Sequence, residues 1–94
     1  MKTIYKYEIR STDVQVVMMP EDAKILTVQT QHGTPCLWVG VVVENPEKER
    51  TIKIYGTGRC LPENPGEYIG TYQLATRGRG LVFHVYELRK SGAL

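Results

Sequence analysis

The sequence lacks any apolar run long enough to cross a membrane. Its longest one, residues 36–43, is far shorter than the roughly 20 residues that a membrane-spanning helix needs. The N-terminal segment Ile4-Tyr5-Lys6-Tyr7-Glu8 alternates apolar and charged residues, so it contains no apolar core of a signal peptide. We therefore expect a protein without membrane contacts.

A strong charge of either sign is also absent. The 12 Lys and Arg residues stand against 10 Asp and Glu residues, which leaves a formal net charge of +2. A protein that binds nucleic acid through its surface usually has a clear basic excess on one face. The small net charge argues against a general polyanion surface, and it still allows a local anion site.

Cysteine and histidine are scarce. Cys36 and Cys60 allow one disulfide at most, and Cys36 begins an apolar run in which we expect it to pack as a small hydrophobic side chain. A reduced, cytoplasmic protein is the simpler interpretation. Because the chain has only two histidines and no Cys-x-x-Cys pair, it lacks the usual ligand set of a structural metal. We expect neither a metal nor a cofactor.

Sequence motifs of enzymes are missing as well. There is no Gly-x-Ser-x-Gly nucleophile elbow, and no acid stands where it would evidently orient His32 or His84. His84 alternates with Val82 and Tyr86, which leaves two interpretations open. It is either a hydrogen-bonded, partly buried imidazole or a contact to a ligand. We expect a protein that is not an enzyme.

What the sequence does have is an apolar alternation of period two along nearly its whole length, which predicts β-strands. The expected strands cover residues 3–10, 14–19, 24–31, 37–43, 50–55, 68–74 and 81–88. We expect a single all-β domain over residues 1–94, mainly antiparallel, with about seven strands. The pattern does not separate a sandwich from a barrel, and it allows one short helical turn at 20–23.

Two features bear on packing and assembly. The segment 37–43 has apolar residues on both faces, which predicts a central strand that forms a hairpin with 24–31. Four large side chains are expected to point outward: Val17, Ile25, Tyr55 and Tyr86. Because so small a core cannot absorb them, we expect a homo-oligomer, most simply a symmetric dimer.

The segment Tyr55-Gly56-Thr57-Gly58-Arg59 combines glycines with an arginine at the end of an expected strand. Its glycines permit a backbone in which successive amides face an anion. Thr57 and Arg59 can add a hydroxyl and a bidentate guanidinium contact to a phosphate, and Tyr55 can stack on a base. The segment lacks the residues that complete a P-loop or a dinucleotide-binding motif, and a strand-end turn or β-bulge explains it equally well.

A second segment of this kind, residues 76–80, places Arg77 and Arg79 beside glycines. It is either an exposed hairpin tip or a loop that closes over a phosphorylated ligand, in which case charge-assisted bonds must offset the ordering entropy.

Two aromatic residues complete the candidate site. Tyr68 stands two residues before Gly70, whose missing side chain would let a ligand or a partner backbone approach closely. Trp38, with Gly40 on the same strand face, is either a core residue or a second stacking surface. The residues predicted to bind a ligand are Trp38, Tyr55, Gly56, Thr57, Gly58, Arg59, Tyr68, Arg77, Arg79 and His84.

Several short motifs, in their order and spacing, resemble a known family. They are Ile4-Tyr5-Lys6-Tyr7, Met19-Pro20-Glu21-Asp22-Ala23-Lys24-Ile25-Leu26, Leu37-Trp38-Val39, Tyr55-Gly56-Thr57-Gly58, Tyr68-Ile69-Gly70-Thr71 and Phe83-His84-Val85-Tyr86-Glu87. Over nearly the whole chain they resemble a family of small proteins of unassigned function that is encoded mostly in bacteriophage and prophage genomes. The resemblance implies a viral accessory protein in the bacterial cytoplasm. One strategy of such proteins is to sequester a nucleotide-derived immune signal of the host.

The residues and the resemblance together lead us to expect a non-enzymatic protein that binds and sequesters a phosphorylated, nucleotide-type small molecule as a homo-oligomer. The alternative is a protein-interaction or structural phage protein, either a host-factor inhibitor or a virion accessory, without a small-molecule ligand. Two other interpretations rank lower. A single-stranded nucleic-acid binder with stacking tyrosines is disfavoured by the small net charge, and a phosphodiesterase that uses His84 is disfavoured by the missing nucleophile and metal ligands.

Overall fold

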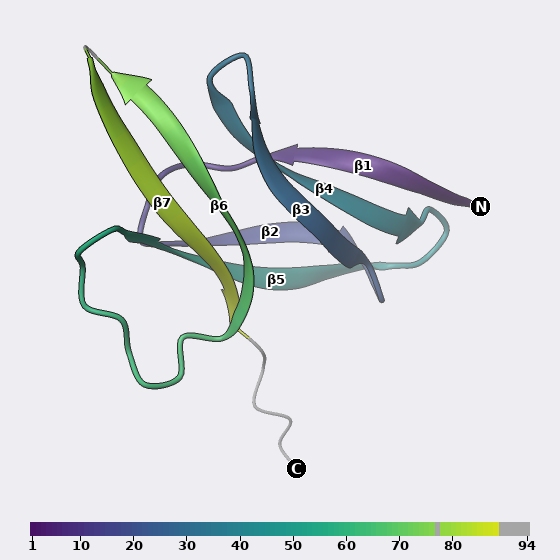
Figure 1. Cartoon of the computed structure of the whole chain (residues 1–94). Coiled ribbons are helices and arrows are strands. Elements are labelled where there is room, and N and C mark those ends of the chain that lie inside the picture. The colour runs from purple at the N-terminus through teal and green to yellow at the C-terminus, as the bar shows by residue number, and fades with distance from the viewer. Residues whose placement is uncertain (77, 89–94) are drawn as a thin grey trace.

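The computed structural model, which describes residues 1–76 and 78–88, consists of two antiparallel β-sheets packed face to face (Figure 1). Its strands are β1 (Lys2–Glu8), β2 (Val14–Pro20), β3 (Lys24–Gln31), β4 (Thr34–Val42), β5 (Glu47–Gly56), β6 (Glu67–Thr76) and β7 (Arg79–Leu88). Sheet A has the order β1-β4-β3, and sheet B has the order β2-β5-β7-β6. The predicted all-β, antiparallel architecture is confirmed, and it is two packed sheets rather than a closed barrel.

The hairpin of β3 and β4 forms as the sequence predicted, with β4 at the centre of sheet A and β3 at its edge. β4 is the middle strand, and Leu37, Val39 and Val41 on it are buried against sheet B. The two residues between the strands, His32 and Gly33, both have positive φ, 52° and 80°. Such a two-residue turn matches the right-handed twist of the strands it joins, so it fixes their register.

The hydrophobic core fills the space between the sheets. Its buried members are Ile9, Met19, Ala23, Val28, Leu37, Val39, Val41, Ile52, Ile54, Tyr72 and Val85. Because side chains alternate between the two faces of a strand, these buried residues show which other side chains face inward. Val17 shares the face of the fully buried Met19, so the expectation that Val17 points outward is wrong.

The same expectation is wrong for Ile25, and here the reason is a β-bulge. The pairing of β3 with β4 shifts register between Ile25 and Thr27, which places Leu26 at the bulge, 48% exposed. A bulge adds one residue to its strand and reverses the alternation beyond it. Ile25 and Val28 can therefore both pack on the core, although three positions separate them.

The two sheets meet at the edge strands β3 and β6. β6 carries its own bulge, between Tyr68 and Gly70, beside the bulge of β3. A Cβ atom built on Gly70 would lie 2.9 Å from Cγ1 of Val28. Gly70 therefore permits the close approach of the two sheets at this edge, where the sequence had left open the approach of a ligand or of a partner backbone.

The expected helical turn at 20–23 is a tight β-turn instead. The Ala23 N–H donates to the Pro20 carbonyl oxygen at 3.1 Å, and Asp22 has a φ of 66°. A left-handed residue interrupts a right-handed helix, and aspartate tolerates that conformation better than most residues. This turn leads directly from sheet B into sheet A.

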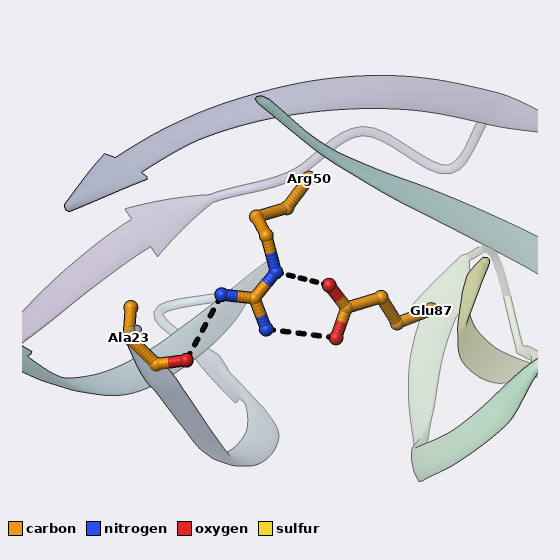
Figure 2. A network of polar contacts seen from close by, with 3 residues as sticks. All are labelled: Ala23, Arg50 and Glu87. Carbon is orange, nitrogen blue, oxygen red and sulfur yellow. Dashed lines mark hydrogen bonds and ion pairs between the residues drawn. The ribbon is translucent and has the colours of Figure 1, made fainter. Parts of the chain in front are cut away.

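At the same end of the molecule, Arg50 pairs with Glu87 within sheet B and also binds the turn that leads into sheet A (Figure 2). Arg50 on β5 donates from Nε and Nη2 to the two carboxylate oxygens of Glu87 on β7, and from Nη1 to the Ala23 carbonyl oxygen at 2.9 Å. The two side chains are only 23% and 12% exposed. The bonded carboxylate raises the pKa of Arg50 above its ordinary value, so this cation keeps its charge.

Candidate ligand-binding site

A hollow lies where β5 extends beyond β2. The last residue pair of these strands is Val14 with Lys53, whereas β5 continues to Gly56. The loop before β2 lies beside the end of β5, from which the next loop continues (Figure 1), and residues of both loops line the hollow. The hollow has a volume of about 590 Å³ and is lined by Ser11, Thr12, Asp13, Lys53, Ile54, Tyr55, Gly56, Gly58, Arg59, Cys60 and Phe83.

The open edge of β5 contributes backbone groups to this hollow. The Ile54 N–H points to the β2 side, where it donates to the Asp13 carbonyl oxygen at 3.1 Å. In an antiparallel ladder, alternate residues direct their N–H and C=O groups to the same edge. The Gly56 N–H is therefore directed to the side that β2 no longer covers. The Arg59 side chain folds back over Gly56, since a Cβ there would lie 3.7 Å from Arg59 Cγ.

The chemistry of the lining is mixed. Arg59 and Lys53 bring two positive charges, Ser11 and Thr12 bring hydroxyl groups, and Asp13 brings one carboxylate. The Lys53 ammonium lies over the Tyr55 ring, 5.8 Å from its centroid. A ligand that fits must pair its negative charge with Arg59 or Lys53 and present a neutral hydroxyl or amino group to Asp13.

The predicted nest of successive free amides does not form. The Thr57 N–H donates to the Val82 carbonyl oxygen at 3.1 Å, and the Arg59 N–H donates to the Gly56 carbonyl oxygen at 3.1 Å. Gly58 adopts a φ of 91°, which closes this turn. The alternative interpretation, a strand-end turn, is the correct one. Side-chain cations and the edge amide of Gly56 remain as anion donors.

The Thr57 hydroxyl joins a second group, on the outer face of sheet B. Its Oγ1 lies 2.8 Å from His84 Nε2, and His84 Nδ1 lies 3.0 Å from Thr71 Oγ1. Thr71 Oγ1 in turn lies 2.6 Å from the Tyr68 hydroxyl. Both ring nitrogens of His84 are thus hydrogen-bonded, which matches the interpretation of a satisfied, half-buried imidazole. The chain of hydroxyls links the end of β5 to β6.

Three tyrosines form a row beside this group. The ring of Tyr86 meets Tyr55 edge to face at a centroid distance of 5.7 Å and Tyr68 at 5.4 Å. Tyr55 is thus at the border between the hollow and the outer face. The expectation that Tyr55 and Tyr86 point away from the core is confirmed, because their chain neighbours Ile54 and Val85 are buried in it.

The remaining predicted residues lie elsewhere. Trp38 is half-buried on the outer face of sheet A, since its neighbours Leu37 and Val39 face the core. It is therefore on the opposite side of the molecule from Tyr55. Arg79 pairs with Thr76 at the start of β7, three residues before Val82 and so about 10 Å further along the strand. Arg77 lies outside the described residues.

The sequence interpretation missed three parts of this region. Lys53 stands two residues before Tyr55 and shares its strand face, a signal that alternation alone provides. The loop 11–13 reaches the hollow only through the pairing of β2 with β5, and that pairing is not visible in the sequence. Thr71 was quoted within a motif but received no role, although it bonds His84.

Two further observations concern the described part of the chain. Cys36 is buried and Cys60 is exposed, and both are free thiols. Among residues 1–76 and 78–88, the structure has no helix that is long and apolar enough to span a membrane.

Comparison with known proteins identifies a family for the chain but no function. Neither the curated proteins nor the solved structures contain a match. A family model described as "Domain of unknown function (DUF7352)" matches residues 1–93, which confirms the expectation of a family of unassigned function. The chain belongs to this DUF7352 family.

Proposed function

We propose that the hollow beside β5 binds a small anionic ligand that carries an aromatic ring, of the nucleotide class, and that the protein acts by binding rather than by catalysis. The observation that carries this proposal is the presence of Arg59, Lys53 and Tyr55 in one hollow of about 590 Å³. Ligand sites of small molecules typically measure about 300–1,000 Å³. The hollow therefore has room for a nucleotide-sized molecule.

The proposed contacts follow from the lining. A phosphate accepts bidentate hydrogen bonds from the Arg59 guanidinium and one from the Gly56 N–H. The Tyr55 ring provides a flat surface for a base, and Phe83 provides an apolar wall. Asp13 accepts a hydrogen bond from a sugar hydroxyl or an exocyclic amine and repels a second phosphate at that end. The hollow thus favours one orientation of the ligand.

The biological part of the proposal rests on the sequence resemblance alone. In it, the protein is a phage-encoded accessory protein of the bacterial cytoplasm, and the ligand is a host nucleotide signal that the protein sequesters. Its residues act by holding the signal, so turnover of a bound nucleotide would contradict this role.

Calorimetric titration tests the proposal directly. The ligands are adenosine and guanosine phosphates, cyclic nucleotides, ADP-ribose and, as a control, inorganic phosphate. We expect at least one nucleotide to bind, and Arg59→Ala to weaken its binding by about 10- to 100-fold, since a charge-assisted hydrogen bond contributes about 1.5–3 kcal/mol. Lys48→Ala is the matched control, because Lys48 is exposed, pairs with Glu21 and does not line the hollow.

Two results would contradict the proposal. One is the absence of heat for every nucleotide when circular dichroism shows the protein to be folded. The other is an equal loss of affinity in Arg59→Ala and Lys48→Ala, which would indicate a general charge effect instead of a site.

A further inference from the structure

The outer face of sheet B carries an unusual share of exposed apolar side chains. Val14, Val16 and Met18 alternate along β2 and are 52%, 54% and 46% exposed. Leu88 on β7 and Tyr68 on β6 extend the same face at 39% and 54%. The register of the four strands places these residues side by side around the half-buried Thr51. An apolar surface of this kind marks an interaction site.

Few charged side chains point outward on this face, and those on β5 are arranged around Thr51. By alternation the outward positions of β5 are Glu47, Glu49, Thr51, Lys53 and Tyr55, and Glu49 and Lys53 stand at equal distances on either side of Thr51. A twofold axis that lies in the plane of the face and crosses β5 at Thr51 brings Lys53 of one chain opposite Glu49 of a second one. The exchange occurs twice, because a twofold interface is self-complementary.

We propose that the outer face of sheet B is a homodimer interface, with the two β5 strands antiparallel across a twofold axis at Thr51 and with Lys53 paired to Glu49 of the partner subunit. The face supplies what interface centres are enriched in, namely tyrosine and methionine, and few charges. Its outward positions on β5 carry one Lys against two Glu residues, so the face does not offer the basic groove of a single-stranded nucleic-acid binder. A second copy of this chain fits the pattern better.

The face is smaller than a standard protein–protein interface. Four strands about 4.8 Å apart, with about seven residues of each in contact, give a footprint of about 400 Å². That is roughly half of the 800 Å² that each partner contributes to a standard interface. We therefore expect a dimer that dissociates in the micromolar range.

Charge reversal tests the interface and its geometry together. Sedimentation velocity between 1 and 200 µM should show a monomer–dimer equilibrium for the wild type. Lys53→Glu and Glu49→Lys should each weaken it by at least 10-fold, because each brings like charges together twice. The double variant Lys53→Glu/Glu49→Lys should dimerise like the wild type. An equimolar mixture of the two single variants should form a heterodimer, since both contacts then join opposite charges.

Lys6→Glu is the matched control, because Lys6 lies on the outer face of sheet A, opposite Trp38, and should leave the dimer unchanged. Circular dichroism checks that each variant is folded. A wild type that stays monomeric at 200 µM would overturn the proposal, and so would single reversals that dimerise normally. Retention of single-stranded oligonucleotides by the monomer would assign the face to nucleic acid instead. Lys53 belongs both to this face and to the hollow, whereas Glu49 does not line the hollow and Arg59 is not part of this face. Glu49→Lys therefore tests the dimer alone and Arg59→Ala tests the ligand site alone, so the two proposals can fail separately.

Discussion

Tyr72 connects the core to the rim of the hollow. Its side chain is buried, its ring stacks on Phe83 at a centroid distance of 5.3 Å, and its hydroxyl lies 2.8 Å from Ser11 Oγ. Burial raises the pKa of Tyr72, and the hydrogen bond with Ser11 opposes part of this rise. The folded state thus holds the phenolic proton more tightly than the unfolded state does.

This difference predicts how stability depends on pH. A tyrosine whose folded pKa is raised contributes its full stability below its unfolded pKa of about 10, and it loses that contribution as the pH rises above this value. Urea unfolding at pH 8, 9.5 and 11 should show a falling free energy of unfolding for the wild type and a weaker fall for Tyr72→Phe. At pH 8 we expect Tyr72→Phe to cost about 0.5–1.5 kcal/mol, for the lost hydrogen bond.

A second tyrosine, Tyr7, also contributes to the expected pH dependence and provides a control. Its pKa is also raised, first by burial and then by the charge of Glu47, so part of the pH dependence should remain in Tyr72→Phe and disappear in Tyr7→Phe/Tyr72→Phe. Parallel curves for the wild type and Tyr72→Phe would contradict the assignment to Tyr72.

Individual site residues could be predicted from the sequence where the chemistry is local. Tyr55, Gly56 and Arg59 do line one hollow, because they are neighbours in the chain. The Thr57 amide could not be predicted, because its hydrogen bond to Val82 depends on where β7 lies. The pairing of distant strands decides which backbone N–H groups stay free to bind a ligand, and a local residue pattern does not predict that pairing.

At the scale of strands, Arg50 and Glu87 tie β5 to β7 through two hydrogen bonds. They lie on the inward faces of neighbouring strands, and Arg50 also binds the carbonyl oxygen of Ala23 just before β3. Removing one partner leaves a largely buried charge without its counterion. Breaking a fully buried pair costs about 3–5 kcal/mol, and partial exposure should reduce this to about 2–3 kcal/mol here.

A double-mutant cycle separates this pairing from simple packing. We expect Arg50→Met and Glu87→Leu each to lower the free energy of unfolding by about 2–3 kcal/mol, whereas the double variant should cost less than the sum by at least 1 kcal/mol. Chemical denaturation measures all three. Additive losses would show that the two side chains act independently. The conclusion that the pair stabilises the contact between the strands would then be wrong.

The strands themselves were predictable from alternation, and their relative lengths were not. The range predicted for β3 agrees with its observed bounds, Lys24–Gln31, whereas β5 begins at Glu47 instead of residue 50. The hollow exists because β5 extends beyond the end of β2. This difference in length depends on how the two strands pair, and neither strand's sequence shows it alone. Bulges were missed for the same reason, since only the partner strand defines a register.

At the scale of the whole molecule, the two layers decide which residues share a surface. Alternation correctly predicted that Trp38 and Tyr55 are strand residues. It could not assign them to different sheets, because strand order is set by long-range packing. Once Trp38 is on the outer face of sheet A and Tyr55 on that of sheet B, one ligand cannot contact both residues across the core.

The layers are held together where β3 meets β6, and Gly70 sets their distance. A Cβ at Gly70 would approach Val28 Cγ1 to 2.9 Å, and it would lie 3.8 Å from the Val28 backbone nitrogen. The φ of Gly70 is not in the left-handed region, so the obstacle to a side chain is the neighbouring sheet alone. Gly70→Ala should therefore destabilise the protein by about 1–3 kcal/mol through overpacking.

Removing the obstructing methyl groups tests this account. Val28→Ala alone should cost about 2 kcal/mol, since Val28 is buried in the core. In Gly70→Ala/Val28→Ala the new methyl group occupies part of the space that valine leaves, so the double variant should be more stable than the sum of the single losses predicts. Gly33→Ala is the contrasting variant: no atom lies within 4 Å of the added Cβ, but the φ of 80° is strained, so Val28→Ala should not relieve its cost. Additive losses in Gly70→Ala/Val28→Ala would mean that the sheets adjust freely, and the separation of the two layers would then have to be set by the rest of the core.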